Sequence, residues 1–224
     1  MFRVPFFKNC ITINTINLFT MILIRIAILI TLGYSITLFE CTPKNKSQLA
    51  ISISSKAKQA KIFAEENGLN TNFCILIDMS IHSGKNRLFI YNFKKDSILD
   101  HGLCAHGCCD NEWSADSTKT TPYFSNVPES HCSSLGKYKI GKRGYSNWGI
   151  NINYRLHGLE STNNNAYSRA IVLHSWNMIS EKETHPTGTP EGWGCPAVSN
   201  NFMRKLDSLL KKEEQPLLMW IYNK

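Results

Sequence analysis

One apolar stretch near the N-terminus divides the chain into two parts that cannot share a fold. Residues 21–39 read MILIRIAILITLGYSITLF, and Arg25 is the only charged residue among them. Arg3 and Lys8 precede the stretch, and no acidic residue does. A basic start followed by an apolar run is typical of an export signal, and an uncleaved membrane anchor is the alternative. We therefore expect residues 1–40 to be a signal peptide or membrane anchor, and the remainder to fold in the periplasm or cell envelope.

The remainder has the composition of one globular domain. The chain has 224 residues, of which 42% are hydrophobic and 19% charged, and this excludes a disordered or fibrous protein. The formal net charge is +8, but no run of five or more basic residues occurs. Because a nucleic-acid footprint requires clustered positive charge, we expect no nucleic-acid partner.

Short apolar runs bounded by turn residues predict a mainly β domain. The predicted strands cover residues 73–78, 87–93, 98–105, 136–141, 154–157, 170–174 and 217–222. A turn at 83–86 predicts that the first two strands pair as a hairpin. Apolar residues at three- and four-residue spacing predict amphipathic helices at 44–68 and 199–212. We expect a helical lead-in at 41–72 and a β-rich domain with peripheral helices at 73–224.

Cysteine and histidine residues crowd into the segment 101–109, which reads HGLCAHGCC. The cluster superficially resembles a zinc knuckle, but structural zinc sites bring together two ligand pairs from separated segments. A disulfide between Cys132 and one of Cys104, Cys108 and Cys109 is the favoured reading in an exported domain, and free loop thiols are the alternative. We expect no bound metal.

A second cysteine and histidine pair has the spacing of a nucleophile and its base. The strand 170–174 ends at His174, Ser175 follows, and Cys195 comes 21 positions after the histidine, directly behind Gly194. A thiol nucleophile needs a neighbouring base, and the base needs an orienting group. Backbone N–H groups of a glycine-rich turn can face a developing oxyanion. A buried, unreactive Cys195 remains the alternative.

Several segments, in the same order along the chain, resemble the L,D-transpeptidase catalytic (YkuD-type) family. Its signature is a His followed by Gly or Ser, a variable segment, and Ser/Thr-His-Gly-Cys; here His174-Ser175 and Gly194-Cys195 correspond to it. The form Gly-Cys-Pro-Ala-Val is similar to the murein L,D-transpeptidase branch, as are the segments 124–130, 133–138, 156–160 and 163–174. The resemblance covers residues 73–222.

The chain departs from the family pattern at two positions beside the cysteine. Trp193 stands where the broad family has a histidine, although the Gly-Cys-Pro branch commonly lacks that histidine. Ala197 stands where the wider family usually has a polar residue. The base role in the family belongs to the upstream histidine, which here is His174.

The resemblance implies a β-sandwich-like catalytic domain that acts on peptidoglycan stem peptides without a metal or organic cofactor. In the family reaction a thiolate attacks the L-centre carbonyl of diaminopimelate in a tetrapeptide donor, and terminal D-Ala leaves. An amine of another stem then resolves the thioester and forms a 3–3 crosslink. The resemblance assigns Cys195 as nucleophile, His174 as base and then acid, and Ser175 as the group that orients the imidazole. The amides of Gly194 and Cys195 are the candidate oxyanion donors.

Some assignments stay open at this stage. Water in place of the amine would make the protein an L,D-carboxypeptidase, and a non-catalytic cell-wall-binding domain is a further alternative. His157 also precedes a glycine, but it lies 38 positions before Cys195 and is expected to be a satisfied polar residue. Arg169 is expected to form a structural salt bridge rather than to bind substrate. Ser175 can orient His174 through its hydroxyl or through its backbone carbonyl, and the oligomeric state is not indicated.

Overall fold

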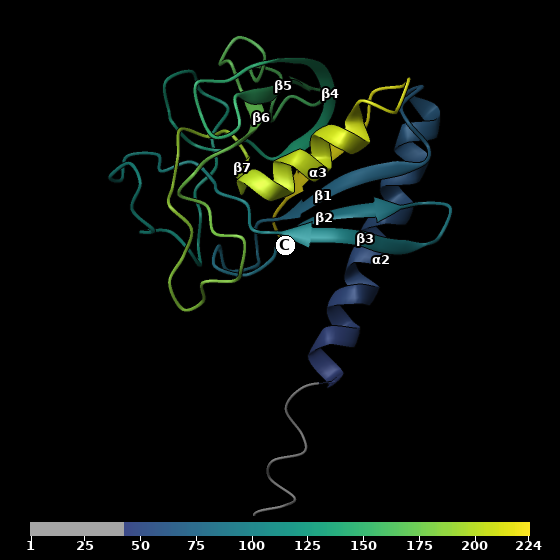
Figure 1. Ribbon diagram of the computed structural model, residues 1–224, viewed down its shortest axis with the longest axis horizontal. Helices are drawn as coiled ribbons and strands as arrows, with labels where there is room; N and C mark the ends of the chain where they lie inside the picture. Colours follow the sequence, from purple (N-terminus) through teal and green to yellow (C-terminus); the bar gives the residue numbers. More distant parts are fainter. Residues whose placement is uncertain (1–42) are drawn as a thin grey trace, which may run out of the picture. The chain divides into compact units, whose positions relative to one another are not determined.

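The computed structural model describes residues 43–224, so the predicted signal or anchor segment lies outside the described residues. Residues 51–224 form one compact unit. In this part of the chain the fold is a single eight-stranded sheet with two helices (Figure 1). No helix within residues 43–224 combines the length and the apolar character that crossing a membrane requires. The predicted mainly β fold with peripheral helices is confirmed, with all eight strands in one sheet.

The sheet is mixed, and its order brings distant segments side by side. The strands are β1 (Phe73–Asp78), β2 (Leu88–Asn92), β3 (Ser97–Gly102), β4 (Gly136–Tyr145), β5 (Ile152–Gly158), β6 (Val172–Ser175), β7 (Ala197–Val198) and β8 (Leu218–Tyr222). The helices are α2 (Pro43–Glu66) and α3 (Asn200–Leu210). The strand order is β3-β2-β1-β8-β4-β5-β6-β7. The pairs β1/β8 and β6/β7 are parallel and the remaining pairs are antiparallel.

The predicted strands are all present, and the predicted hairpin of β1 and β2 is confirmed. β4 continues to Tyr145, beyond the predicted end at 141, across a register irregularity between Ile140 and Arg143. β7 was not predicted, because two residues are too few to show the alternation that identifies a strand.

The centre of the sheet is covered on both faces. Met219 and Ile221 of β8 belong to the core cluster that also contains the buried side chains of α3. The alternate residues Trp220 and Tyr222 point to the opposite face, because side chains along a strand alternate between faces. There the Nζ of Lys56 in α2 lies 4.4 and 4.7 Å from their ring centroids. This two-sided cover explains why β8 is apolar without a polar face.

Helix α3 is held against the sheet by one buried carboxylate. The side chain of Asp207 accepts hydrogen bonds from Arg143 Nε of β4 and from the Tyr154 hydroxyl of β5, both at 2.7 Å. Lys211 Nζ lies 3.1 Å from the same carboxylate. Burial by itself would raise the pKa of Asp207, but the hydrogen bonds from Arg143, Tyr154 and Lys211 hold it at about 2. The carboxylate therefore ties α3 to the two strands that lead to β6.

Replacing this carboxylate should cost stability in a pH-dependent way. The pKa of Asp207 is lower in the folded state than in the unfolded chain, so its contribution is complete above about pH 4 and is lost as the pH falls toward 2. We expect Asp207→Asn to lower the free energy of unfolding by about 1–2 kcal/mol at pH 7, after discounting for the exposed Arg143 and Lys211. Urea unfolding at stepped pH should show this difference shrinking below pH 4.

Asp100 provides the matched control, because it also pairs with a lysine but its side chain is 29% exposed, against 8% for Asp207. Asp100→Asn should change the stability by less than about 0.5 kcal/mol. An Asp207→Asn variant that is destabilised equally at pH 7 and pH 2 would contradict the role given to the carboxylate.

Candidate active site

The parallel pairing of β6 and β7 brings the predicted histidine and cysteine together. His174 lies opposite Ala197 in the register, and the backbone N–H of Val172 points to Cys195 Sγ at 3.4 Å. The backbone N–H of His174 donates to the Pro196 carbonyl at 3.4 Å. His174 is buried, whereas Cys195 is partly accessible. The structure thus places the imidazole and the thiol on neighbouring segments, and both line the same two cavities.

The backbone carbonyl of Ser175, and not its hydroxyl, orients the imidazole. His174 Nδ1 lies 2.9 Å from the Ser175 carbonyl oxygen. A carbonyl only accepts, so Nδ1 must carry the proton, and Nε2 of the neutral ring keeps its lone pair. The Ser175 hydroxyl instead accepts from the Ile150 N–H at 3.0 Å. This arrangement leaves Nε2 able to take a proton from a neighbouring thiol.

Burial favours the uncharged forms of both groups. Burial lowers the pKa of His174, although the bond to the Ser175 carbonyl offsets part of the change. Burial also raises the pKa of the Cys195 thiol. The Val172 N–H and the positive charges of Arg169 and Arg155 lower this pKa, but by less than burial raises it. The resting pair is therefore a neutral imidazole and a neutral thiol, so an attack by this sulfur would require proton transfer to a base.

Glycine is required at position 194. Its φ of +92° favours glycine, and a Cβ would collide with the Cys132 carbonyl oxygen. The Gly194 carbonyl accepts from the Ser133 hydroxyl at 3.2 Å. Among the hydrogen bonds of residues 43–224, none uses the backbone N–H of Gly194 or Cys195 as donor. Both predicted oxyanion donors are therefore unengaged, as the role demands.

The predicted salt bridge of Arg169 is wrong. Arg169 precedes β6 in a turn, so strand alternation does not decide where it points, and within residues 43–224 it has no acidic partner. Its guanidinium donates to the Cys132 carbonyl at 2.7 Å and to the Ser134 hydroxyl at 2.6 Å. It also donates to the Ser125 carbonyl at 3.0 Å. Arg169 thus holds the loop segment that abuts Gly194.

The open question about cysteine pairing is answered by a disulfide between Cys109 and Cys132. Cys104 and Cys108 are free and buried, while His101 is exposed on β3. Within residues 43–224, no three His, Cys, Asp or Glu side chains are grouped as metal ligands would be. Both cysteines lie in the long segment between β3 and β4, and the disulfide joins the start of this segment, at Cys109, to its end, at Cys132.

The histidine of the zinc-like segment belongs to a buried hydrogen-bonded chain. Arg87 Nη2 donates to His106 Nδ1 at 2.8 Å, so the His106 proton resides on Nε2, which lies 2.7 Å from the Thr118 hydroxyl. That hydroxyl lies 3.0 Å from Glu191 Oε1, which also accepts from the Thr118 N–H at 2.6 Å. Burial lowers the pKa of His106 and keeps it neutral. The chain anchors Glu191, four residues before Cys195.

The thiol lies between two cavities of different character. One has a volume of about 610 Å³ and is polar, with Lys142, Arg155 and Asn153 among its lining residues. The other has a volume of about 90 Å³, and four of its eight lining residues are tryptophans. His174, Cys195 and Trp148 line both cavities. The imidazole and the thiol therefore form part of the wall of both cavities.

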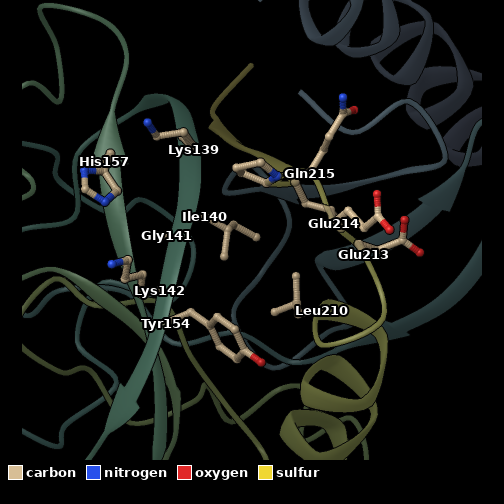
Figure 2. A pocket seen from close by; sticks show the side chains of 12 residues that line it. Lys139, Ile140, Gly141, Lys142, Tyr154, His157, Leu210, Glu213, Glu214 and Gln215 are labelled. Carbon is tan, nitrogen blue, oxygen red and sulfur yellow. The ribbon is translucent and has the colours of Figure 1, made fainter. Parts of the chain in front are cut away.

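His157, the alternative histidine, lines a different groove. Figure 2 shows it on β5 with Lys139 of β4, while Glu213 and Glu214 lie across the groove on the segment that follows α3. This groove has a volume of about 370 Å³, and no cysteine is among its lining residues. The His157 ring stacks on Tyr167 with the centroids 5.0 Å apart. The structure does not bring His157 to the candidate nucleophile.

Three features of the site escaped the sequence reasoning. The Arg169 contacts, the Arg87–Glu191 chain and the tryptophan-lined cavity all join residues that lie tens of positions apart, and no local pattern marks them. The tryptophan count offered a weak signal, because four of the chain's five tryptophans line the small cavity.

Comparison with known proteins gives a family match over most of the chain. A sequence model described as the L,D-transpeptidase catalytic domain matches residues 45–222, so the match includes α2 as well as the sheet. No curated protein matches the chain.

Solved structures resemble the chain only distantly. The avibactam carbamoyl enzyme of Ldtfm is 9% identical with a TM-score of 0.41, over 68% of this chain and 49% of that one. The helical cell shape determining protein Pgp2 from Campylobacter jejuni is 12% identical with a TM-score of 0.42, over 68% and 48%. An L,D-transpeptidase from Xylanimonas cellulosilytica is 14% identical with a TM-score of 0.38, over 71% and 67%. The chain spans about half the length of the first two.

The protonated thiol leads to a prediction about alkylation. Because burial raises the pKa of Cys195, iodoacetamide should modify it slowly at pH 7, and the rate should rise only above the ordinary thiol pKa of about 8.5. Peptide mass spectrometry after timed quenching would measure the rate at Cys195. Arg155→Gln should move the midpoint to still higher pH, because it removes a charge that favours the thiolate.

Lys205 is the control for this measurement, since its exposed ammonium pairs with Asp100 outside both cavities. Lys205→Gln should leave the midpoint unchanged. A rate at Cys195 that is already maximal at pH 7 would mean that a thiolate–imidazolium pair exists in the resting protein, against the neutral pair described above.

Proposed function

The chain belongs to the family of L,D-transpeptidase catalytic domains, and on this basis we propose that it is a cysteine acyltransferase that crosslinks peptidoglycan stem peptides. The substrate of such a domain is cell-wall peptidoglycan, which suggests that the protein works outside the cytoplasm. The finer proposal is that Cys195 forms a thioester with a tetrapeptide donor, and that an amine of a second stem resolves it to a 3–3 crosslink.

One observation carries the proposal more than any other. The Ser175 carbonyl accepts the proton that His174 carries on Nδ1, so Nε2 is unprotonated. The same imidazole lines two cavities together with the Cys195 thiol. A base, an orienting group and a nucleophile are the three components that activate a thiol. Two unengaged backbone amides at Gly194 and Cys195 add the donors that an oxyanion needs.

The acylation half of the reaction follows from these groups. Cys195 Sγ attacks the donor carbonyl carbon while its proton passes to His174 Nε2. The carbonyl oxygen becomes an oxyanion that the amides of Gly194 and Cys195 stabilise. The carbon–nitrogen bond to D-Ala then breaks, and the amine leaves with the proton that His174 returns to it. The product is a thioester on Cys195 and a neutral His174.

The deacylation half reverses the roles. An acceptor amine attacks the thioester carbonyl, and His174 accepts the proton that the amine loses. The carbon–sulfur bond breaks, and the sulfur recovers the proton from the imidazole. Since the same neutral pair begins and ends the cycle, no external acid or base is consumed.

The larger, polar cavity suits the donor. A tetrapeptide stem carries carboxylates, and Lys142 and Arg155 are the cationic side chains that line this cavity. Its volume of about 610 Å³ is compatible with a peptide, unlike the 90 Å³ of the aromatic cavity. Charge complementarity and size therefore both favour donor entry from the Lys142 side.

The role of each histidine can be tested by acylation. We expect a carbapenem to form a covalent adduct on Cys195, and a tetrapeptide donor to release D-Ala. Cys195→Ala should abolish both, and His174→Ala should slow both by about 10²–10⁴-fold through loss of the general base. Intact-protein mass spectrometry and a D-Ala assay would measure these effects.

His157→Ala is the matched control, because the groove of Figure 2 that His157 lines contains neither His174 nor Cys195, and the variant should retain near-normal rates. The assignment fails if the adduct appears on Cys104 or Cys108 while Cys195 stays unmodified. It also fails if His157→Ala loses the activity that His174→Ala keeps. A folded wild-type protein that forms no adduct and releases no D-Ala would favour the non-catalytic wall-binding alternative.

The positive charges of Lys142 and Arg155 in the polar cavity should lower KM for the tetrapeptide donor. Lys142→Gln and Arg155→Gln should each raise KM for the tetrapeptide about three- to tenfold with a smaller change in kcat, since both groups act on the bound carboxylates. Added salt should raise the wild-type KM more than that of the variants. Lys139→Gln is the control, because Lys139 lines only the groove of Figure 2. Equal effects of Lys139→Gln and Lys142→Gln would contradict this placement of the donor.

A further inference from the structure

Four tryptophans gather on one side of the candidate nucleophile. Trp113 is central: its ring centroid lies 5.3 Å from that of Trp176, 6.1 Å from Trp148 and 6.3 Å from Trp193. Trp148 and Trp176 are themselves 6.1 Å apart. These spacings are those of interacting aromatic rings. We call these four side chains the tryptophan cluster.

The four rings of the tryptophan cluster come from four different segments, and backbone hydrogen bonds attach two of these segments to the residues around Cys195. Trp176 follows β6 directly, and its N–H donates to the Val198 carbonyl at 2.9 Å. The N–H of Ser114, which follows Trp113, donates to the Glu191 carbonyl at 2.9 Å. This bond attaches the loop of Trp113 to the turn that carries Gly194 and Cys195. Trp193 belongs to that turn, two residues before Cys195. The cluster is therefore built onto the same framework as the nucleophile.

Much of this aromatic surface is not buried by the protein itself. The exposed fractions are 39% for Trp113, 44% for Trp148 and 58% for Trp193, while Trp176 is 6% exposed and forms the floor. Large exposed apolar side chains that are grouped together indicate a contact site. The small cavity among them is lined also by His174 and Cys195, and no Lys, Arg, Asp or Glu lines it.

This environment bears on which group attacks the thioester. An aromatic wall without charged side chains holds water poorly, and it packs well against a short aliphatic chain. Tryptophan faces also attract the ammonium form of an amine, which raises its local concentration before the proton is lost. The cavity volume of about 90 Å³ suits an amine-bearing arm rather than a whole peptide.

We infer that the tryptophan cluster is the subsite for the acceptor amine, and that it directs the thioester toward aminolysis rather than hydrolysis. The inference rests on the proposed function and extends it. A primary amine at the end of a short aliphatic chain lies among Trp113, Trp148 and Trp193. Its nitrogen forms the new amide bond to the thioester carbonyl, the carbon–sulfur bond breaks, and the amine proton passes through His174 to the sulfur. Trp193, which replaces the histidine of the broader family, forms part of this wall.

The test measures how the acyl-enzyme divides between its two products. Protein is incubated with a tetrapeptide donor and a stem tripeptide that bears a free side-chain amine. Released D-Ala reports acylation, and mass spectrometry counts crosslinked and hydrolysed products. In Trp113→Ala and Trp193→Ala, the ratio of crosslinked to hydrolysed product should fall at least tenfold, while D-Ala release stays within about threefold of wild type. Trp113→Phe should restore most of the ratio, because an aromatic face remains.

Tyr123→Ala is the control, since Tyr123 is an aromatic residue, 65% exposed, in the same long loop but outside both cavities. It should leave the ratio unchanged. If Trp113→Ala does not fold, as judged by urea unfolding, Trp193→Ala carries the test, because Trp193 is 58% exposed and lines only the small cavity.

The two proposals fail in different ways. An unchanged product ratio in the folded variants, with D-Ala still released, would overturn the acceptor subsite and leave the acyltransferase intact. A wild-type protein that releases D-Ala but forms only hydrolysed product would also overturn it and identify an L,D-carboxypeptidase. A wild-type protein that releases no D-Ala would overturn the proposed function, and the acceptor subsite with it.

Discussion

The parallel pairing of β7 with β6 is the contact on which the candidate site depends. β7 has only two residues, yet it sets Ala197 opposite His174, and the Val172 N–H then reaches Cys195 Sγ. His174 and Cys195 lie 21 positions apart in the sequence, and this pairing brings them onto neighbouring segments. So short a strand has little stability of its own, and the surrounding loops must supply what is missing.

Those loops support the turn from two sides. On one side Arg169 holds the Cys132 carbonyl, which lies against the Cα of Gly194, and the disulfide of Cys132 with Cys109 ties this segment down. On the other side Glu191 ends the buried chain that begins at Arg87. Charged groups are costly to bury, and each here meets hydrogen-bonding partners. These hydrogen bonds offset the cost of burial, and the two charged groups support the turn of Gly194 and Cys195 from both sides.

The electrostatics of the site follow from the same burial. Burial lowers the pKa of the His174 imidazole and raises the pKa of the Cys195 thiol, so both groups favour their neutral forms. The two cavities that Cys195 lines differ in volume and in the charge of their lining residues. The side of Lys142 and Arg155 is charged and wide, and the side of the tryptophan cluster is apolar and narrow.

The mainly β fold could be predicted from local patterns, and the family resemblance pointed to His174 and Cys195 as the candidate pair. Apolar runs marked seven of the eight strands, and the signature around His174 and Cys195 marked the site. Tertiary structure alone decided which oxygen of Ser175 orients the imidazole, because hydroxyl and carbonyl are equally available along the chain. Tertiary structure alone also decided that Cys109 pairs with Cys132. It likewise decided that the Arg169 guanidinium donates hydrogen bonds to backbone carbonyls instead of pairing with a carboxylate. These contacts join segments far apart in sequence, and only the folded sheet brings them within hydrogen-bonding distance.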